Sequence, residues 1–165
     1  MVKGGSGATR RLPPTLMKIL VENRQSLIKI NPRKLKRDSL ALLTAFRLNK
    51  AELGVLLVDD RQMKQLNRLH RSLNKTTDVL SFPIYERRVE IPVDRESLLG
   101  DIVINLDAAK RQSSLYGLTL LGEVRRLLIH GFLHLLGYDH ERSLFQKKKM
   151  RRYENELRNA LETLD

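Results

Sequence analysis

The chain has 165 residues and a mass of 19.1 kDa, which suits one domain with a buried core. It contains no cysteine, and this excludes disulfides, cysteine-based zinc sites, thiol nucleophiles and iron–sulfur clusters. The formal net charge of +12 predicts a polyanionic partner, nucleic acid first and an anionic membrane surface second, while no apolar run is long enough to predict a membrane span.

The first 14 residues are basic and rich in glycine, and they end at the pair Pro13 and Pro14. This composition predicts a flexible basic arm. The arm lacks the apolar centre of a signal peptide; an organelle transit peptide stays open, although the stretch has no amphipathic period. We expect residues 15–165 to form a single domain.

Apolar periodicity predicts both strands and helices along that domain. Pro32 and Asp107 are expected to begin two of the helices, and Gly117 and Gly137 to end two. The polar stretch 85–98 predicts a mobile loop. The predicted elements in chain order are a strand at 16–22, a helix at 33–48, a strand at 52–59, a helix at 60–73, strands at 79–84 and 100–106, and helices at 107–116, 119–136 and 143–162.

These elements predict the α+β class, because strands and helices do not strictly alternate. We expect one mixed sheet of about four strands, packed with about five helices. The helix over 119–136 is almost entirely apolar, so it is expected to be the central buried one.

Three of the four histidines lie within eleven residues, in the stretch HGFLHLLGYDH. His130 and His134 are four residues apart on the central helix, so both rings project from one face. Gly137 allows the chain to fold back and bring His140 toward them. Three neutral imidazoles suit Zn²⁺ and leave a fourth position for water, which is typical of catalytic sites. The pattern predicts a metal site at the end of the central helix.

A non-metal explanation accounts poorly for this cluster, because three buried imidazoles would need several hydrogen-bond partners. His70, in contrast, stands alone in the polar stretch RLHR and is expected to be solvated. Glu123 lies seven residues before His130 and has two interpretations of equal weight. It either orients a histidine of the site or complements the positive end of the helix.

The histidine spacing equals that of zinc peptidases with the pattern H-E-x-x-H-x-x-G-x-x-H. Those enzymes use the glutamate beside the first histidine as general base, and here that position is Gly131. A peptidase is therefore disfavoured. Combined with the basic charge, the site favours phosphodiester hydrolysis.

The stretch LNRLHRSLNKTTDVLSFP places Arg68, Arg71 and Lys75 where a predicted helix ends before a strand. Cations there complement the negative end of the helix, and taken alone this structural explanation is favoured. The alternative is that one arginine binds a phosphate through both of its terminal nitrogens.

Three blocks together resemble the YbeY family of bacterial and organellar rRNA maturation factors. HGFLHLLGYDH resembles the family signature H-G-x-L-H-L-x-G-Y-D-H, and LNRLHRSLNKTTDVLSFP resembles a second block that contains an arginine. LLGDIVI resembles a third block, a strand with G-D-I. The resemblance extends from about Leu53 to His140 and continues weakly into the last helix.

The resemblance implies a metal-dependent endoribonuclease that is specific for single-stranded RNA. It implies one zinc ion per chain bound by His130, His134 and His140, and a catalytic role for Arg71, which would hold the scissile phosphate while metal-activated water attacks. It further implies 16S rRNA 3′-end maturation and ribosome quality control in the cytoplasm, with RNA and the small ribosomal subunit as partners.

The general base stays open. Asp78, Asp101 and Asp139 are candidates, and Asp139 has the alternative role of orienting a histidine. Two other hypotheses compete with the nuclease: a non-catalytic, ribosome-associated RNA-binding protein with a structural metal, and a metallopeptidase-like hydrolase.

The chain departs from many relatives in the charge of its flanks. Residues 1–50 hold 12 basic and 2 acidic residues, a net of +10, and residues 142–165 hold 7 and 4, a net of +3. Residues 51–141, which carry the motifs, have a net charge of −1. Where relatives have an acidic stretch after the third histidine, this chain has RSLFQKKKMRRYENEL. Two basic flanks favour contact with an RNA backbone.

Overall fold

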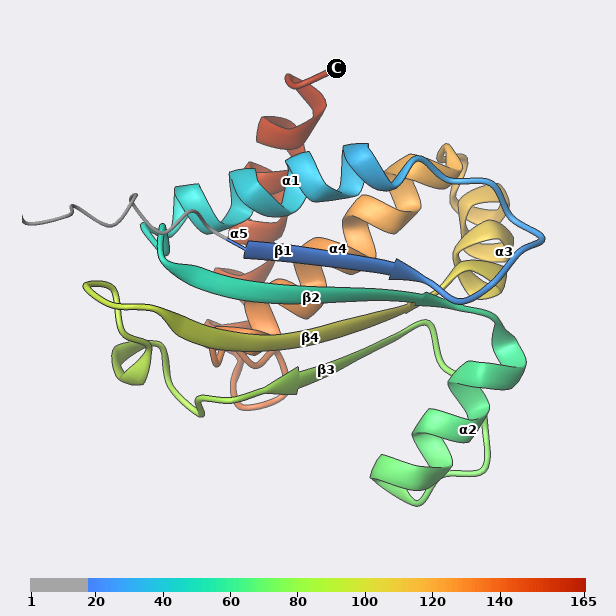
Figure 1. The fold of residues 1–165 in the computed structure, drawn as a ribbon, viewed down its shortest axis with the longest axis horizontal. Coiled ribbons are helices and arrows are strands. Elements are labelled where there is room, and N and C mark those ends of the chain that lie inside the picture. The colour runs from blue at the N-terminus through green and yellow to red at the C-terminus, as the bar shows by residue number, and fades with distance from the viewer. Residues whose placement is uncertain (1–17) are drawn as a thin grey trace, which may run out of the picture.

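One sheet of four strands and five α-helices make up residues 18–165, the part of the chain that the computed structural model describes (Figure 1). The predicted basic arm, residues 1–14, lies outside the described residues. The elements are β1 (Lys18–Asn23), α1 (Pro32–Ala45), β2 (Ala51–Val58), α2 (Asp60–Arg71), β3 (Val79–Pro83), a short 3₁₀ helix η1 (Arg88–Glu90), β4 (Ser97–Asn105), α3 (Leu106–Tyr116), α4 (Leu120–Leu135) and α5 (Leu144–Glu162).

The strand order in the sheet is β1-β2-β4-β3. β1, β2 and β4 run parallel, and β3 pairs antiparallel with β4 at the edge. The predicted mixed sheet and the α+β class are therefore confirmed. Helix α2 and a polar connection separate β3 from β2 in the sequence. This length of chain allows β3 to pair with β4 at the edge of the sheet instead of running parallel beside β2.

The main hydrophobic core lies between one face of the sheet and helices α1, α3, α4 and α5. α4 is central to it, since Leu128, Phe132 and Leu133 are fully buried among residues of the other elements. This confirms the prediction of a buried central helix. A smaller cluster of Val58, Met63, Leu80 and Val103 packs under α2 on the opposite face. Figure 1 shows α2 projecting away from the other four helices.

The helix ends follow the predicted signals with one correction. Pro32 begins α1, Gly117 ends α3, and both glycine-based turns expected in the second half are left-handed. The predicted cap of α3 by Asp107 is wrong. Asn105 caps that helix by accepting from the backbone N–H groups of Asp107 and Ala108, so the Asp107 carboxylate is left to accept from the N–H of Asp60.

The stretch 85–98, predicted as a loop, is only partly irregular. It contains η1 and the buried side chain of Ile91, which packs into the main core. β4 begins at Ser97, three residues before the predicted start at Gly100, because Leu99 is buried in the same core. A single apolar side chain such as Ile91 gives no periodicity, so the sequence pattern does not reveal this anchor.

α5 is the longest helix of the described chain and contains the largest number of Lys and Arg residues, six. It begins after Ser143, whose side chain caps it, and buries only Met150, Leu157 and Leu161 against the rest of the molecule. Between residues 18 and 165 there is no helix with the length and apolarity that crossing a membrane requires.

Candidate metal centre

Three histidines meet where α4 ends. The Nε2 atoms of His130 and His134 lie 3.0 Å apart, and the ring of His140 has its centre 5.4 Å from the centres of both other rings. One ring nitrogen from each residue lies within 4.8 Å of the other two. The cluster that the spacing predicts is therefore present, and these three residues could hold one metal ion.

The turn after α4 brings His140 back to the helix. Gly137 adopts a left-handed conformation with φ of 87°, and its N–H donates to the carbonyl of His134. The N–H of Tyr138 donates to the carbonyl of Leu133, which closes the turn. A side chain at Gly137 would also collide with the backbone of Glu86, so both the conformation and the space require glycine.

The donor atoms suit a cation. His140 Nδ1 is buried and has no hydrogen-bond partner within the described chain, which leaves a lone pair or an N–H unsatisfied. The Nε2 atoms of His130 and His134 face each other, and only one hydrogen fits between them, so at least one of the two atoms presents a lone pair. Burial, followed by repulsion from His130 and His140, lowers the pKa of His134 below its usual value, so the neutral imidazole that metals require is favoured.

A carboxylate from α5 supports the cluster. Glu154 Oε1 lies 2.7 Å from Nδ1 of His130 and accepts its hydrogen, so the lone pair of Nε2 faces the other histidines. Although burial raises the pKa of Glu154, the hydrogen bond to His130 holds it below the ordinary value. Sequence reasoning missed this residue, because it follows His130 by 24 positions and belongs to a different helix.

Glu123, the alternative considered for this role, does not contact the histidines. It is fully buried in the first turn of α4, where its carboxylate pairs with Arg126 at 2.6 Å. The structure therefore favours the interpretation that Glu123 complements the positive end of the helix.

A hollow of about 440 Å³ lies in front of the histidines. Arg71, the last residue of α2, lines it, although some sixty residues separate it from the cluster in sequence. Arg71 is exposed and forms no ion pair with any residue of 18–165, so its guanidinium is available to an anion. The complete lining is Arg71, Asp78, Val79, Ser81, Pro83, His130, His134, Asp139, His140 and Glu141.

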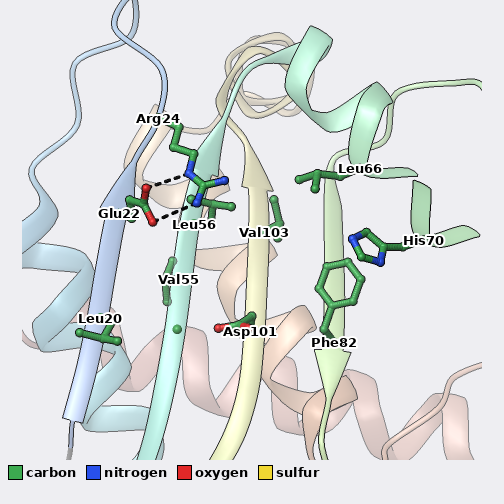
Figure 2. A pocket seen from close by; sticks show the side chains of 11 residues that line it. Leu20, Glu22, Arg24, Val55, Leu56, Leu66, His70, Phe82, Asp101 and Val103 are labelled. Carbon is green, nitrogen blue, oxygen red and sulfur yellow. Dashed lines mark hydrogen bonds and ion pairs between the residues drawn. The ribbon is translucent and has the colours of Figure 1, made fainter. Parts of the chain in front are cut away.

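Two of the three candidate bases share this hollow, and the third does not. Asp78 and Asp139 line it, with Asp78 accepting from Gln112 and Asp139 accepting from the N–H of Glu141. That backbone hydrogen bond is the main reason why the pKa of Asp139 is lowered. Asp101 is wrong as a candidate, because it lies on the opposite face of the sheet (Figure 2).

Figure 2 shows Asp101 in a separate hollow of about 540 Å³, on the face of the sheet that the main helices leave open. His70 lines the same hollow, where its ring packs edge-on against Phe82 with centroids 5.0 Å apart. His70 is exposed, as predicted, and lies apart from the histidine cluster.

Gly131 lies where α4 packs closely against β3 and β4. A Cβ atom there would come within 2.7 Å of Ile102 and 3.1 Å of the Ser81 hydroxyl, which itself donates to the Gly131 carbonyl. The position that carries the general base in zinc peptidases therefore faces β3 and β4 and has no room for a carboxylate. The structure thus adds a steric reason to the chemical argument against a peptidase.

The fold and the site define a class: α+β proteins with a mixed sheet and an open three-histidine cluster beside an arginine. Comparison with known proteins narrows this class to one family. The profile of the family described as Endoribonuclease YbeY matches residues 20–162. The chain belongs to this family, so the resemblance seen in the sequence is confirmed.

Similar proteins support the assignment of the chain to this family. The chain is 41% identical to Endoribonuclease YbeY of Aquifex aeolicus, over 82% of this chain and 90% of that protein. It is 49% identical to the Myxococcus xanthus protein of the same name, over 71% of this chain but 39% of that longer protein. The solution structure of a Thermotoga maritima protein shares the fold, with a TM-score of 0.58 and 24% identity over 88% of this chain and 92% of that one.

Proposed function

We propose that this chain is a zinc-dependent endoribonuclease that cleaves single-stranded RNA. The observation that carries the proposal is the hollow that joins the three histidines to Arg71. A cation site beside a free guanidinium suits a phosphodiester, since the two can share the charge of one phosphate. The name of the curated relatives, Endoribonuclease YbeY, supports the same activity.

Each residue of the centre has a task in this proposal. His130, His134 and His140 hold the zinc ion, which when bound supplies Lewis-acid polarisation of a phosphoryl oxygen and activation of a water molecule. Arg71 binds the scissile phosphate and stabilises the charge that grows on it during attack. Asp78 and Asp139 are the two carboxylates of the hollow that can accept the proton released from water.

Replacing Arg71 by alanine separates catalysis from metal binding. We expect the Arg71→Ala variant to keep its metal and to lose about 10²- to 10³-fold in kcat on single-stranded RNA, because one stabiliser of the developing charge is removed. The matched control is Arg68→Ala. Arg68 is an exposed cation on the same helix, but it does not line the hollow. Equal cleavage by Arg71→Ala and wild type would exclude the assigned role.

Replacing Glu154 by glutamine tests the support of His130. A glutamine keeps the size of the side chain but removes the charge that fixes the His130 tautomer, so we expect metal affinity to fall about 10- to 100-fold. Competition with a chelator of known affinity measures this change. Glu156→Gln is the control, since Glu156 lies on α5 and, among residues 18–165, pairs only with Arg152. A loss of the same size in both variants would contradict the assignment.

The biological setting is also part of the proposal. We infer that residues 15–165 form one catalytic domain, and that it acts in the cytoplasm on the 3′ end of 16S rRNA and in ribosome quality control, with the small ribosomal subunit as partner. The high positive charge of the chain supports a large RNA as substrate. Mapping the 3′ ends of 16S rRNA tests this setting in cells that carry either the wild-type or the Arg71→Ala protein. Unprocessed ends should accumulate in the cells that carry the variant.

A further inference from the structure

Behind the histidines, on the side of α5, lies a second and smaller hollow. Its volume is about 200 Å³, and it shares His130 and His140 with the hollow that contains Arg71. Those two histidines therefore stand between the hollows, and both hollows open beside the same candidate metal site. The complete lining is Arg126, His130, His140, Lys147, Met150, Arg151 and Glu154.

A third hollow extends the same path along α5. It measures about 190 Å³, and Leu144, Lys147, Lys148 and Arg151 line it. Because it shares Lys147 and Arg151 with the second hollow, the three hollows adjoin one another in a row. The row begins at Arg71 on α2, passes the histidines and ends on the first turns of α5.

The cations that line this row differ in whether an acidic residue already pairs with them. Arg126 is held by the buried Glu123. Lys147 and Arg151 are exposed, and neither forms an ion pair with any residue of the described chain. Glu154, the carboxylate in the second hollow, is engaged by His130. Arg71, Lys147, Lys148 and Arg151 therefore carry the uncompensated positive charge of the row, and of these Lys147 and Arg151 line both hollows along α5.

The position of these cations is electrostatically unfavourable for the isolated protein. The first turn of α5 contains Lys147 and no acidic residue, and Lys148 and Lys149 follow directly, although the positive end of a helix favours acids. Lys147 and Arg151 also lie one turn apart on the same helix face, where like charges repel. A bound anion relieves both effects, so the arrangement indicates an anionic ligand at this place.

We propose that Lys147 and Arg151 bind the backbone phosphates of the RNA strand next to the phosphate that is cleaved. This inference rests on the proposed nuclease function and adds a second binding site to it. The strand would cross Arg71 and the histidines and continue along α5. Contacts to phosphates alone carry no sequence information, so this site holds the strand without selecting bases.

The test removes both cations and measures binding and cleavage separately. In the metal-loaded protein carrying Lys147→Ala and Arg151→Ala, we expect a roughly tenfold higher Kd for a 2′-O-methyl single strand of about 12 nucleotides at low salt. We also expect the slope of log Kd against log salt to fall by about 1.4, because two phosphate contacts are lost and each contributes about 0.7. A dinucleotide contains only the phosphate that is cleaved, so its cleavage should fall much less than cleavage of the longer strand.

The matched control removes the same charge elsewhere. Arg61 and Lys64 are exposed on the first half of α2, in the nearly neutral segment 51–141, and line none of the three hollows. We expect the Arg61→Ala, Lys64→Ala protein to bind the same strand within about threefold of wild type.

Three results would overturn the proposal: equal losses in the two double variants, an unchanged salt slope, or an equal fall of kcat on the dinucleotide and on the longer strand. Because the 2′-O-methyl strand reports binding alone, absence of any RNA cleavage by wild type would refute the nuclease function separately.

Discussion

A His134→Ala variant is expected to lose its metal and, with it, RNA cleavage. His134 lies on α4 between the other two histidines, with its Nε2 3.0 Å from that of His130. Its removal leaves two donors, too few for a tetrahedral zinc site with one open position. We expect the loss of metal affinity to exceed the 10- to 100-fold that follows from disturbing an outer partner. Metal content per chain after dialysis measures it directly.

His70→Ala is the control for this experiment. His70 is the fourth histidine of the chain, and it lies on the opposite face of the sheet beside Phe82. The His70→Ala protein should keep one metal per chain and full cleavage. Retention of one metal per chain in His134→Ala would contradict the assigned ligand set.

The second large effect concerns stability and comes from a buried ion pair that anchors α4. Arg125, five residues before His130, has a side chain that is only 4% exposed, and its Nε donates to the fully buried Asp38 of α1 at 2.7 Å. Its terminal nitrogens also donate to Asp165, and this pairing with Arg125 lowers the pKa of that carboxyl.

Replacing Arg125 by methionine leaves the Asp38 carboxylate buried, with only a longer contact of 3.3 Å to Arg37. We expect the free energy of unfolding to fall by about 3–5 kcal/mol, as is usual when one partner of a buried pair is removed. For a chain of this size the melting temperature should drop by about 10 °C. Urea unfolding followed by circular dichroism measures the change.

The double variant Arg125→Met, Asp38→Leu distinguishes a lost pair from a lost packing contact. Because it removes the isolated charge as well, it should recover most of the lost stability. A single variant within about 1 kcal/mol of wild type would show that the pair does not anchor α4.

The sequence predicted the part of the site that depends on local spacing. His130, His134 and Gly137 belong to one helix and its turn, so periodicity and turn chemistry suffice to bring His140 to the other two. Arg71 became a candidate for function through the family resemblance, and only the fold shows that the end of α2 reaches the histidine hollow.

The parts that the sequence did not predict depend on contacts between distant elements. Glu154 joins the site because α5 packs beside α4, and no local pattern encodes that contact. Asp101 was misplaced because side chains of a strand alternate between the two faces, and its place in β4 directs it away from the histidines. The partners of Arg125 likewise come from α1 and from the end of the described chain.

The cap of α3 was predicted at the wrong residue for a different reason. Asn105 and Asp107 both favour helix starts, and their sequence order does not decide between them. The structure selects Asn105 because β4 runs through to this residue, which lets its side chain turn back onto the helix while its amide donates to Asp60.

The central claim is that the three histidines hold a metal on which RNA cleavage depends. The most direct measurement follows the cleavage of single-stranded RNA by one preparation before metal removal, after it, and during stepwise return of zinc. We predict that cleavage disappears with the metal and returns in full at one zinc per chain. Full cleavage by the metal-free protein would contradict the account.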